Sequence, residues 1–466
     1  MLFPTLAFLV FFSAVFAFAW PLRGWPVAHK IFLTAASYFF YGFWDWRFAV
    51  LLALNTLANA GFAVMIAGAA AESSRRMLLW AAVAVNLTVL GFFKYYGFFA
   101  EQLLQLLGQL GLPQNLPLLD IVLPVGISFF TFQGISYVVD VYRREIKPAP
   151  LLHVFLYKAF FPQLVAGPIV RAARFLPQLE HRPELSLPDL TLAGVLIVSG
   201  LFKKLVIANY LATGLVDPVF FDPSQFGRLD LMAALYGYAV QIYCDFSGYT
   251  DMAIGLALLL GFRFDANFNQ PYRARSLQDF WRRWHISLSE WLRDYLYKPL
   301  GGSRSGALFA ARNIAIVMLL GGLWHGAAWT FVIWGAIHGA GLILERWLRP
   351  YLPAGPVAQA VSVIVTFHLV CLAWIFFRAQ SLELALAYLA GLWGNDAAPQ
   401  IASWFFSLLI IASLALHFAP ADLLARIAAG LRRWGWTGAM LATVAGLIVS
   451  VLVAPPGVAP FIYFQF

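Results

Sequence analysis

Charged residues are scarce in this sequence. Asp, Glu, Lys and Arg make up 11% of the 466 residues, whereas a soluble domain has about 25%. Hydrophobic residues make up 62%. A water-soluble fold of this length has too little interior to bury so much apolar surface, so the composition excludes a soluble protein. The solvent of this chain is lipid. The 17 Trp, 18 Tyr and 43 Phe agree with this, because aromatic rings gather at both membrane interfaces.

Cysteine is nearly absent as well. Cys244 and Cys371 both lie in apolar stretches and lack metal-ligand spacing, so we expect two buried thiols, no structural disulfide and no metal site.

The sequence also lacks the positively charged region with which a signal peptide begins. The apolar residues 1–20 contain Ala17-Phe18-Ala19, which could pass for a cleavage site, but no Lys or Arg precedes them. We expect this segment to be retained as the first membrane helix.

Acidic residues are outnumbered by basic ones, which gives a net charge of +9. In a soluble protein this would suggest nucleic acid, but in a membrane protein Lys and Arg accumulate in cytoplasmic loops, so we predict no nucleic-acid partner. Both termini would then lie outside the cytoplasm. The loops expected on the cytoplasmic side are those that contain Arg23/Lys30, Arg75/Arg76, Arg143/Arg144/Lys147, Arg171/Arg174/Arg182, the segment 261–304 and Arg432/Arg433.

Long apolar runs fill most of the chain. A membrane helix needs about 20 apolar residues. The stretch 312–345 is long enough for two passes or a bent hairpin, and no soluble domain or repeat interrupts the series. We therefore predict one all-α, polytopic membrane domain over residues 1–466. Its other candidate spans are 2–20, 31–43, 47–70, 77–99, 118–141, 188–215, 229–262, 357–378, 402–419 and 437–454.

One region breaks this pattern at apparent membrane depth. Residues 160–168 carry Pro162, Gly167 and Pro168. Proline removes a backbone donor, and such backbone persists in lipid only where it is buried in protein or lines a cavity. We expect a re-entrant element here.

The segment 263–304 is polar, with eight Lys or Arg and four Asp or Glu. From Asp279 to Tyr297 the pattern predicts a helix, because apolar residues recur at every fourth position, namely Phe280, Trp284, Leu288, Leu292 and Leu296. One interpretation is an amphipathic helix that lies at the membrane interface. The other is a cytoplasmic platform that receives an anionic donor, such as a coenzyme A thioester.

A single ionisable residue interrupts the apolar stretch after Ile314. His325 lies between glycines in Gly-Leu-Trp-His-Gly at 322–326. An ionisable residue within a membrane segment usually faces a cavity or pathway, although a packing histidine is an equally good interpretation of the residue alone. His338 follows thirteen residues later, about 220° around an ideal helix, so we expect the two rings not to share a face.

Six blocks of the sequence are distinctive in composition and order. Together they resemble the membrane-bound O-acyltransferase family, in particular its bacterial polysaccharide-acylating branch, which includes the membrane subunit of alginate O-acetyltransferase. The resemblance covers most of the chain. The blocks are LPVGISFFTFQ at 123–133, PQLVAGPI at 162–169, DFSGYTDM at 245–252, NFNQPY at 267–272, FWRRWHISLS at 280–289 and GLWHG at 322–326.

The resemblance implies a fold and two functional histidines. Family members form a ring of helices, here expected to number about ten to twelve, with re-entrant elements around a central tunnel. The histidine of the Trp-His-Gly motif, here His325, is the catalytic one. His285, in the Trp-His-Ile-Ser motif, is the second functional position, near the cytoplasmic mouth of the tunnel.

The expected chemistry is transfer of an acyl group, here acetyl, from a thioester donor. The donor is acetyl-coenzyme A or an acyl carrier, and we expect no bound cofactor. Histidine, with an unperturbed pKa near 6.5, suits the removal of a proton from the attacking hydroxyl. No Gly-x-Ser-x-Gly motif accompanies it, which favours direct attack. Asn267, Asn269, Tyr249 and Trp324 are expected to line the tunnel.

The chain ends in Pro-Phe-Ile-Tyr-Phe-Gln-Phe at 460–466. One interpretation of this aromatic tail is an interfacial anchor. The other comes from the resemblance, in which Tyr463 acts as an acyl relay that a periplasmic acetyltransferase of the SGNH type then unloads.

Several functions compete at this point. The leading hypothesis is an acetyltransferase of the bacterial inner membrane that acts on alginate or a similar exported polysaccharide. Peptidoglycan O-acetylation uses nearly the same motifs, and D-alanylation of teichoic acid is a more distant alternative. A transporter without chemistry is the non-enzymatic alternative. A lipid- or protein-acylating relative usually has an upstream Asn where this chain has His285.

Overall fold

The computed structural model describes residues 1–466 except 114–118, 120, 166, 352 and 458–466. Within the described residues every regular element is a helix, which confirms the prediction of an all-α chain. Contacts divide the chain into two compact units, Met1–Glu184 with Leu260–Phe262, and Leu185–Leu259 with Arg263–Phe466. The single membrane domain over 1–466 stays a prediction.

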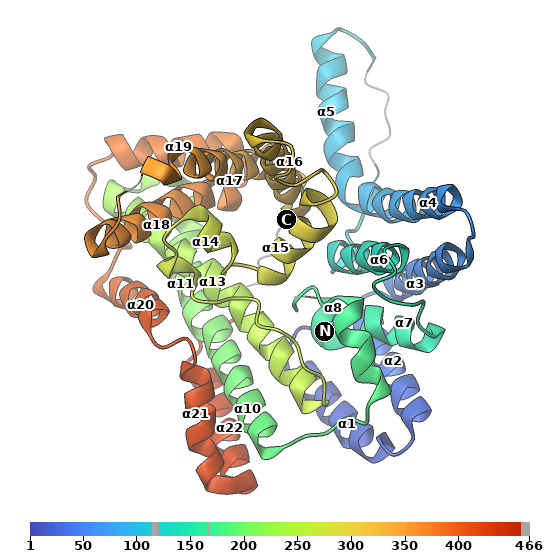
Figure 1. Cartoon of the computed structure of the whole chain (residues 1–466). Coiled ribbons are helices and arrows are strands. Elements are labelled where there is room, and N and C mark those ends of the chain that lie inside the picture. Colours follow the sequence, from blue (N-terminus) through green and yellow to red (C-terminus); the bar gives the residue numbers. More distant parts are fainter. Residues whose placement is uncertain (114–118, 120, 166, 352, 458–466) are drawn as a thin grey trace. The chain divides into compact units, whose positions relative to one another are not determined.

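The first unit contains the helices of the N-terminal third of the chain, coloured blue to blue-green in Figure 1. They are α1 (Leu6–Leu22), α2 (Pro26–Gly42), α3 (Trp46–Gly68), α4 (Glu72–Leu90), α5 (Tyr96–Gln109), α6 (Ile127–Tyr142), α7 (Leu151–Ala159), α8 (Phe161–Leu164) and α9 (Ala172–Phe175).

The second unit contains the remaining helices. They are α10 (Leu187–Phe202), α11 (Asn209–Leu211), α12 (Asp217–Phe221), α13 (Arg228–Leu259), α14 (Leu277–Trp281), α15 (Ile286–Leu292), α16 (Ala307–His325), α17 (Trp329–Leu348), α18 (Pro356–Arg378), α19 (Leu382–Gly394), α20 (Trp404–Ala415), α21 (Leu423–Leu431) and α22 (Gly435–Leu452).

Many of these helices are suited to cross a membrane. Among the described residues, six helices are long and apolar enough, which makes this a multi-pass membrane protein. Three shorter apolar helices, Leu6–Leu22, Leu382–Gly394 and Trp404–Phe418, accompany them. The six long apolar helices are Trp46–Gly68, Glu72–Gln109, Leu187–Phe221, Ala307–His325, Pro356–Arg378 and Leu423–Leu452. The ring of helices around a tunnel stays a prediction.

Among the described residues of the expected span 118–141, the helix begins at Ile127. Gly126 precedes the helix with φ of +76°, a conformation that glycine adopts without steric cost. Its α-carbon lies so close to the Leu164 carbonyl that an added methyl group would be 2.5 Å from the oxygen. The chain therefore turns sharply at Gly126 before α6 begins.

The proline-rich stretch at 160–168 breaks the helix, as predicted. Helix α7 ends at Ala159, Phe160 leaves helical geometry, and α8 lasts only four residues. All residues from Phe160 to Leu164 are buried. The irregular backbone is thus covered by protein, as its missing donors require. Its re-entrant position in a membrane stays a prediction.

Helices α10 and α13 lie side by side in the second unit (Figure 1). Two glycines permit the approach, since a methyl group on Gly200 would meet the Gly248 carbonyl oxygen at 2.4 Å. Lys203 and Lys204, at the end of α10, form ion pairs with Asp251 and Asp245 of α13. Pairing of this kind is how charged residues persist among apolar helices.

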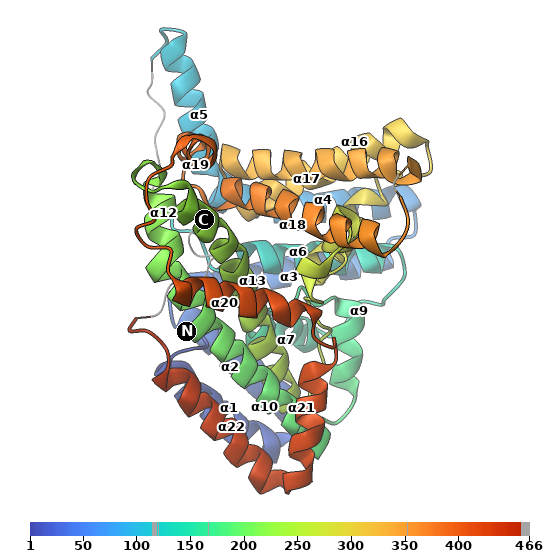
Figure 2. The ribbon, with the colours of Figure 1, turned by 90° about the vertical axis from the view of Figure 1, so that its left-hand side faces the viewer.

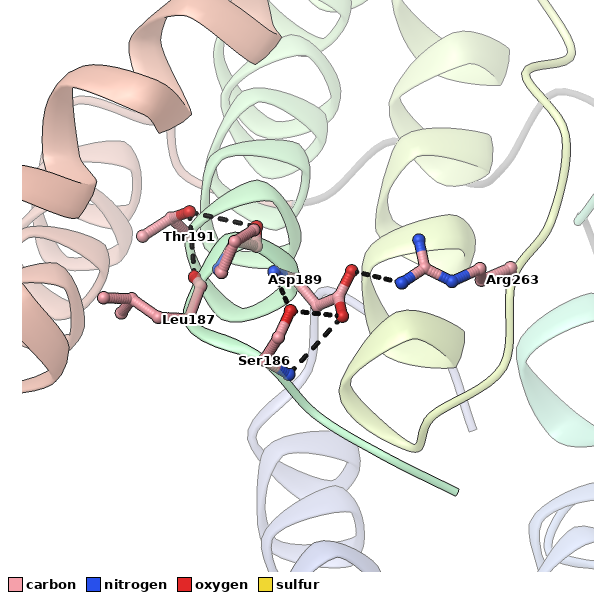
Figure 3. A network of polar contacts seen from close by, with 6 residues as sticks. Ser186, Leu187, Asp189, Thr191 and Arg263 are labelled. Carbon is pink, nitrogen blue, oxygen red and sulfur yellow. Dashed lines mark hydrogen bonds and ion pairs between the residues drawn. The ribbon is translucent and has the colours of Figure 1, made fainter. Parts of the chain in front are cut away.

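Figure 3 shows how the other end of this pair is fixed. Ser186 caps α10, because its hydroxyl oxygen accepts the Asp189 N–H at 3.3 Å and its O–H donates to the Asp189 carboxylate at 2.6 Å. Arg263, just beyond the end of α13, donates to the other carboxylate oxygen of Asp189 at 2.8 Å. The capping box and the ion pair hold the beginning of α10 to the segment that leads toward the polar region.

The predicted helix from Asp279 to Tyr297 is wrong. Helix α14 ends at Trp281, and α15 begins only at Ile286. His285 lies between them with φ of +42°, which an α-helix does not allow. Apolar residues still recur at every fourth position because α14 and α15 both bury apolar side chains. The sequence pattern therefore does not reveal the break between the two helices.

The stretch 312–345 forms two packed helices, which is one of the two arrangements predicted for it. Helix α16 ends at His325 and α17 begins at Trp329, and the two lie side by side with α18 close to α17 (Figure 1 and Figure 2). The backbones touch at glycines. A methyl group on Gly322 would lie 2.2 Å from the Phe331 carbonyl oxygen, and one on Gly335 would lie 2.3 Å from that of Met318.

This contact gives a prediction with an internal control. Gly322→Ala forces α16 and α17 apart, and we expect it to reduce the free energy of unfolding by about 1–3 kcal/mol, the usual cost of overpacking. In Gly321→Ala the new methyl group meets only Leu292 Cδ1 at 3.5 Å, so this variant keeps wild-type stability or gains helix propensity. Thermal unfolding of the purified proteins in detergent compares them. Equal midpoints for the two variants would contradict the close packing.

Candidate functional site

His325 is the last residue of α16 and is 4% exposed. Its ring is surrounded by aromatic side chains. The ring centroids of Trp324, Trp334 and Phe377 lie 5.0, 5.0 and 5.1 Å from that of His325, each in an edge-to-face arrangement. Gly326 follows directly and packs against the Phe331 ring. The hairpin between α16 and α17 therefore places one imidazole in an aromatic pocket.

His285 is fully buried, in the turn between α14 and α15. Asn267 holds this turn from the preceding segment. Its main-chain carbonyl accepts the Ile286 N–H at 2.9 Å, and its Oδ1 accepts the Ser287 N–H and O–H at 3.0 and 2.8 Å. The same Oδ1 lies 3.3 Å from His285 Nδ1. A proton on Nδ1 would point at this oxygen, which leaves Nε2 as the basic nitrogen.

Burial lowers the pKa of His285 to about 3. The ring is therefore neutral at neutral pH. Phe246 of α13 contacts it edge-to-face at 4.7 Å between centroids. A neutral ring among apolar groups can accept a hydrogen bond, whereas its protonation is opposed.

Trp324 links the two predicted histidines. Its ring centroid is 5.0 Å from that of His325 and 6.1 Å from that of His285. On the other side of His325, Trp334 of α17 contacts His338 at 4.9 Å. We call His285, Trp324, His325, Trp334 and His338 the histidine–tryptophan chain. It joins residues from the α14–α15 turn, α16 and α17 by successive ring contacts.

The expectation that His325 and His338 do not share a face is corrected by this arrangement. It assumed one continuous helix, but the helix ends at His325 and resumes at Trp329. Both rings therefore contact Trp334. His338 is 1% exposed and packs on Phe280 and Trp281. Neither of its ring nitrogens has a hydrogen-bond partner among the residues that the structure describes.

The other predicted tunnel residues lie in different environments. Asn267 is buried and holds the His285 turn. Asn269 has an exposed side chain, and its backbone pairs with Arg283. Tyr249 is buried on α13, where Lys204 Nζ lies 5.6 Å from the centre of its ring. Tyr463 lies outside the described residues.

A cavity of about 690 Å³ lies beside the histidine–tryptophan chain, bordered by segment 278–303 and by α16 and α17. Trp281, which contacts both Trp334 and His338, forms part of its wall, as does Ile286, next to His285. Met318, also in the wall, is seven residues before His325, or about 10 Å along the helix axis. The size is that of a small-molecule site.

The cavity wall is rich in arginine. Arg293 pairs with Asp294, and Glu345 accepts the Leu277 N–H at 2.7 Å. Arg282 and Arg349 have no ion-pair partner among the described residues. The wall is therefore cationic and suits an anionic ligand. Its charged residues are Arg282, Arg293, Arg346, Arg349, Glu290 and Glu345.

Sequence reasoning missed two members of this site. The sequence pattern does not single out Trp334, which lies in an apolar stretch, and it predicts His338 on a different helix face from His325. The available signal was the spacing of Trp334 and His338, which is four residues and hence one helical turn. The contact between Trp334 and His325 depends on the hairpin, which the sequence left open between two passes and a bend.

Comparison with known proteins identifies the family of this chain. The model of the membrane-bound O-acyltransferase family matches residues 127–385. The probable alginate O-acetylase AlgI of Pseudomonas aeruginosa is 42% identical over 390 residues, which cover 83% of this chain and 73% of that protein. Its counterpart in Pseudomonas putida is 38% identical over the full length of both chains. The peptidoglycan O-acetyltransferase of Helicobacter pylori is 38% identical, covering 79% of this chain and 74% of that protein.

The matched region contains the whole histidine–tryptophan chain and the cavity beside it. The relatives also match beyond it, over most of this chain and of their own. The chain therefore belongs to the membrane-bound O-acyltransferase family and is an O-acyltransferase.

Proposed function

We propose that this O-acyltransferase takes an acetyl group from a thioester donor in the cytoplasm and passes it across the bacterial inner membrane for O-acetylation of an exported polysaccharide such as alginate. The observation that carries the proposal is the position of His325, a buried imidazole in an aromatic pocket beside a cationic cavity. The relatives named alginate O-acetylase support the substrate class.

In this proposal His325 is the general base. It removes the proton of the acceptor hydroxyl as the oxygen attacks the thioester carbonyl. A C–O bond forms, the C–S bond breaks, and the proton passes from the imidazolium to the departing sulfur, which leaves as a thiol. No covalent intermediate on the histidine is needed. General bases placed in this way contribute about 10²–10⁴-fold to rate.

The aromatic pocket favours this role. When His325 takes up the proton it becomes a cation whose ring centre lies about 5 Å from those of Trp324, Trp334 and Phe377. A cation near an indole face is stabilised by about 0.5–2 kcal/mol, and more so where water is excluded. The pocket therefore stabilises the charge that develops on the base.

The cavity is the proposed donor site. Its cationic wall suits the phosphates of a coenzyme A thioester or of a carrier's phosphopantetheine arm. A donor anchored at Arg282 and Arg349 would direct its acyl end toward Ile286 and Met318, the parts of the wall nearest His285 and His325 along the chain. The wall beside the reacting carbonyl is apolar, which strengthens hydrogen bonds to the developing oxyanion.

His285 is proposed as the second functional histidine, with Asn267 as its positioning residue. The left-handed backbone at His285 costs about 1–2 kcal/mol, and the bonds from Asn267 to Ile286 and Ser287 hold it in that conformation. These hydrogen bonds and the backbone conformation then fix the position of the imidazole ring and of its Nε2 atom. An unprotonated Nε2 makes His285 suited to accept a hydrogen bond from a hydroxyl or amide group of a bound substrate.

Peptidoglycan O-acetylation and D-alanylation of teichoic acid remain alternative acceptors within the same chemistry. The relative named peptidoglycan O-acetyltransferase supports the first. The transporter hypothesis is set aside, because the chain is an O-acyltransferase. Mass spectrometry of polysaccharide and peptidoglycan from a deletion strain identifies the polymer that loses its acyl ester.

The first test replaces the proposed base. His325→Ala is expected to reduce the ester content of the exported polymer by at least about 100-fold in a complemented deletion strain, because no other group takes the hydroxyl proton. His368→Ala is the matched control, since His368 is exposed and hydrogen-bonded to Tyr236. Full acetylation by His325→Ala protein present at wild-type levels would refute the assignment.

The second test addresses the turn at His285. Asn267→Ala removes the acceptor of two Ser287 bonds, and we expect at least about tenfold lower activity, since a buried bond of this kind contributes about 1–3 kcal/mol. Asn269→Ala, with an exposed side chain, should keep wild-type activity. Asn267→Asp places a carboxylate 3.3 Å from His285 Nδ1, so its pH–activity profile should move to higher pH. An unmoved profile would reduce Asn267 to a purely structural role.

The third test concerns the C-terminal tail, whose Tyr463 we propose as an acyl relay to a periplasmic partner. The phenol oxygen, with a pKa near 10, would accept the acetyl group after His325 removes its proton. Tyr463→Phe lacks only that oxygen and should abolish polymer acetylation. Phe464→Leu, which leaves the phenol in place, should not. Normal acetylation by Tyr463→Phe would leave the tail as an interfacial anchor.

A further inference from the structure

The first unit contains a small pocket that the acyl-transfer chemistry does not use. It has a volume of about 180 Å³ and lies where the connection between α1 and α2, the beginning of α7 and the segment 178–183 meet. At about 30 Å³ per water, it has room for roughly six waters, enough for one tetrahedral anion with some of its hydration.

The wall of this pocket is strongly basic. Arg23, Lys30 and Arg182 face a single carboxylate, that of Glu180. Neither Arg23 nor Arg182 has an ion-pair partner among the residues that the structure describes. Three cations and one carboxylate leave the wall with an excess of positive charge, which attracts an anion.

Histidines complete the pocket without cancelling its charge. Lys30 Nζ lies 2.8 Å from His153 Nε2, so the neutral ring accepts a hydrogen bond from the ammonium group. His29 is 5% exposed, lines the same pocket, and its ring forms no hydrogen bond with the described residues. Its ring N–H can therefore donate to an oxyanion bound in the pocket.

The pocket lies where the apolar helix α1 is joined to α2. Helices α1 and α2, of 17 residues each, are joined by only Arg23, Gly24 and Trp25. Trp25 is exposed, and Arg23 lies over the Trp20 ring. Tryptophan and arginine at the end of a helical hairpin mark the level of the lipid headgroups. An anion in this pocket would therefore sit where membrane phosphates are most concentrated.

We infer that this pocket binds a phosphate group, held by Lys30 and Arg182 and hydrogen-bonded by His29. Two sources share this chemistry, the headgroup of an anionic phospholipid and a soluble phosphate. The inference is independent of the proposed acyl transfer, because the pocket belongs to the first unit whereas the histidine–tryptophan chain belongs to the second.

Binding to the purified full-length protein in a phosphate-free detergent buffer tests this. The probes are mixed micelles with phosphatidylglycerol, mixed micelles with phosphatidylcholine, and inorganic phosphate. Dissociation constants come from calorimetry, and thermal unfolding gives a second readout. We expect phosphatidylglycerol to bind and stabilise the wild-type protein, and Lys30→Gln/Arg182→Gln to weaken that binding by at least about tenfold.

The matched control removes the same charge elsewhere in the first unit. Arg76→Gln/Lys147→Gln changes two exposed residues outside the pocket and should bind as the wild type does. Arg182→Gln alone guards against misfolding, because its exposed side chain has no bonding partner among the described residues, and it should show an intermediate loss.

The outcomes separate the sources. Binding of phosphatidylglycerol that inorganic phosphate does not displace identifies a lipid site, and displacement at millimolar phosphate identifies a soluble phosphate. The inference would be overturned if neither phosphatidylglycerol nor inorganic phosphate bound, or if binding were weakened equally in the two double variants. Acyl transfer by the same variants is measured in parallel, so that loss of phosphate binding is not mistaken for failure of the catalytic proposal.

Discussion

The close approach of α16 and α17 is the constraint on which the site depends. At Gly322 and Gly335 the facing carbonyl groups leave no room for a side chain. This contact brings the end of α16 against the first turns of α17, so that Trp334 lies between His325 and His338. A wider hairpin would separate these rings and open the space to lipid. The small residues thus fix the geometry of the large ones, as is common where helices associate without a hydrophobic driving force.

Several polar groups that are buried among the apolar helices of the second unit are held by other polar groups. Lys203 and Lys204 are paired with carboxylates of α13. Asn267 satisfies the turn at His285. His338 is held differently, because neither of its ring nitrogens has a hydrogen-bond partner among the described residues, and the same is true of the Tyr238 hydroxyl and the Trp334 indole N–H. Unsatisfied groups are kept where function requires them, and His338 borders the wall of the proposed donor cavity through Trp281.

Much of this could be predicted from the sequence. Composition required a membrane protein, and hydropathy located most of the spans, because burial in lipid demands continuous apolar runs. The motif around His325 was visible, since an ionisable residue is rare in such a run. The turn at His285 was not, because Phe280, Trp284 and Leu288 kept a helical period across the break. Periodicity indicates which residues are buried, whereas the backbone between them is set by hydrogen bonds to Asn267, eighteen to twenty residues earlier in the chain. The role of Trp334 likewise depends on a tertiary contact that no local pattern records.

The proposed choice of His325 rather than His285 as the base rests on how each ring could carry a charge. His285 is buried against Phe246, and its environment holds the pKa at about 3, so protonation there is strongly opposed. His325 is flanked by three aromatic rings at about 5 Å, two of them indoles, and indole is the side chain that best stabilises a neighbouring cation. A base must hold its proton long enough to return it to the leaving sulfur. We propose His325 as the residue that does so, which leaves His285, oriented by Asn267, to accept a hydrogen bond through Nε2. This division of labour needs no metal and no covalent intermediate, only two imidazoles in environments that differ in their tolerance of charge.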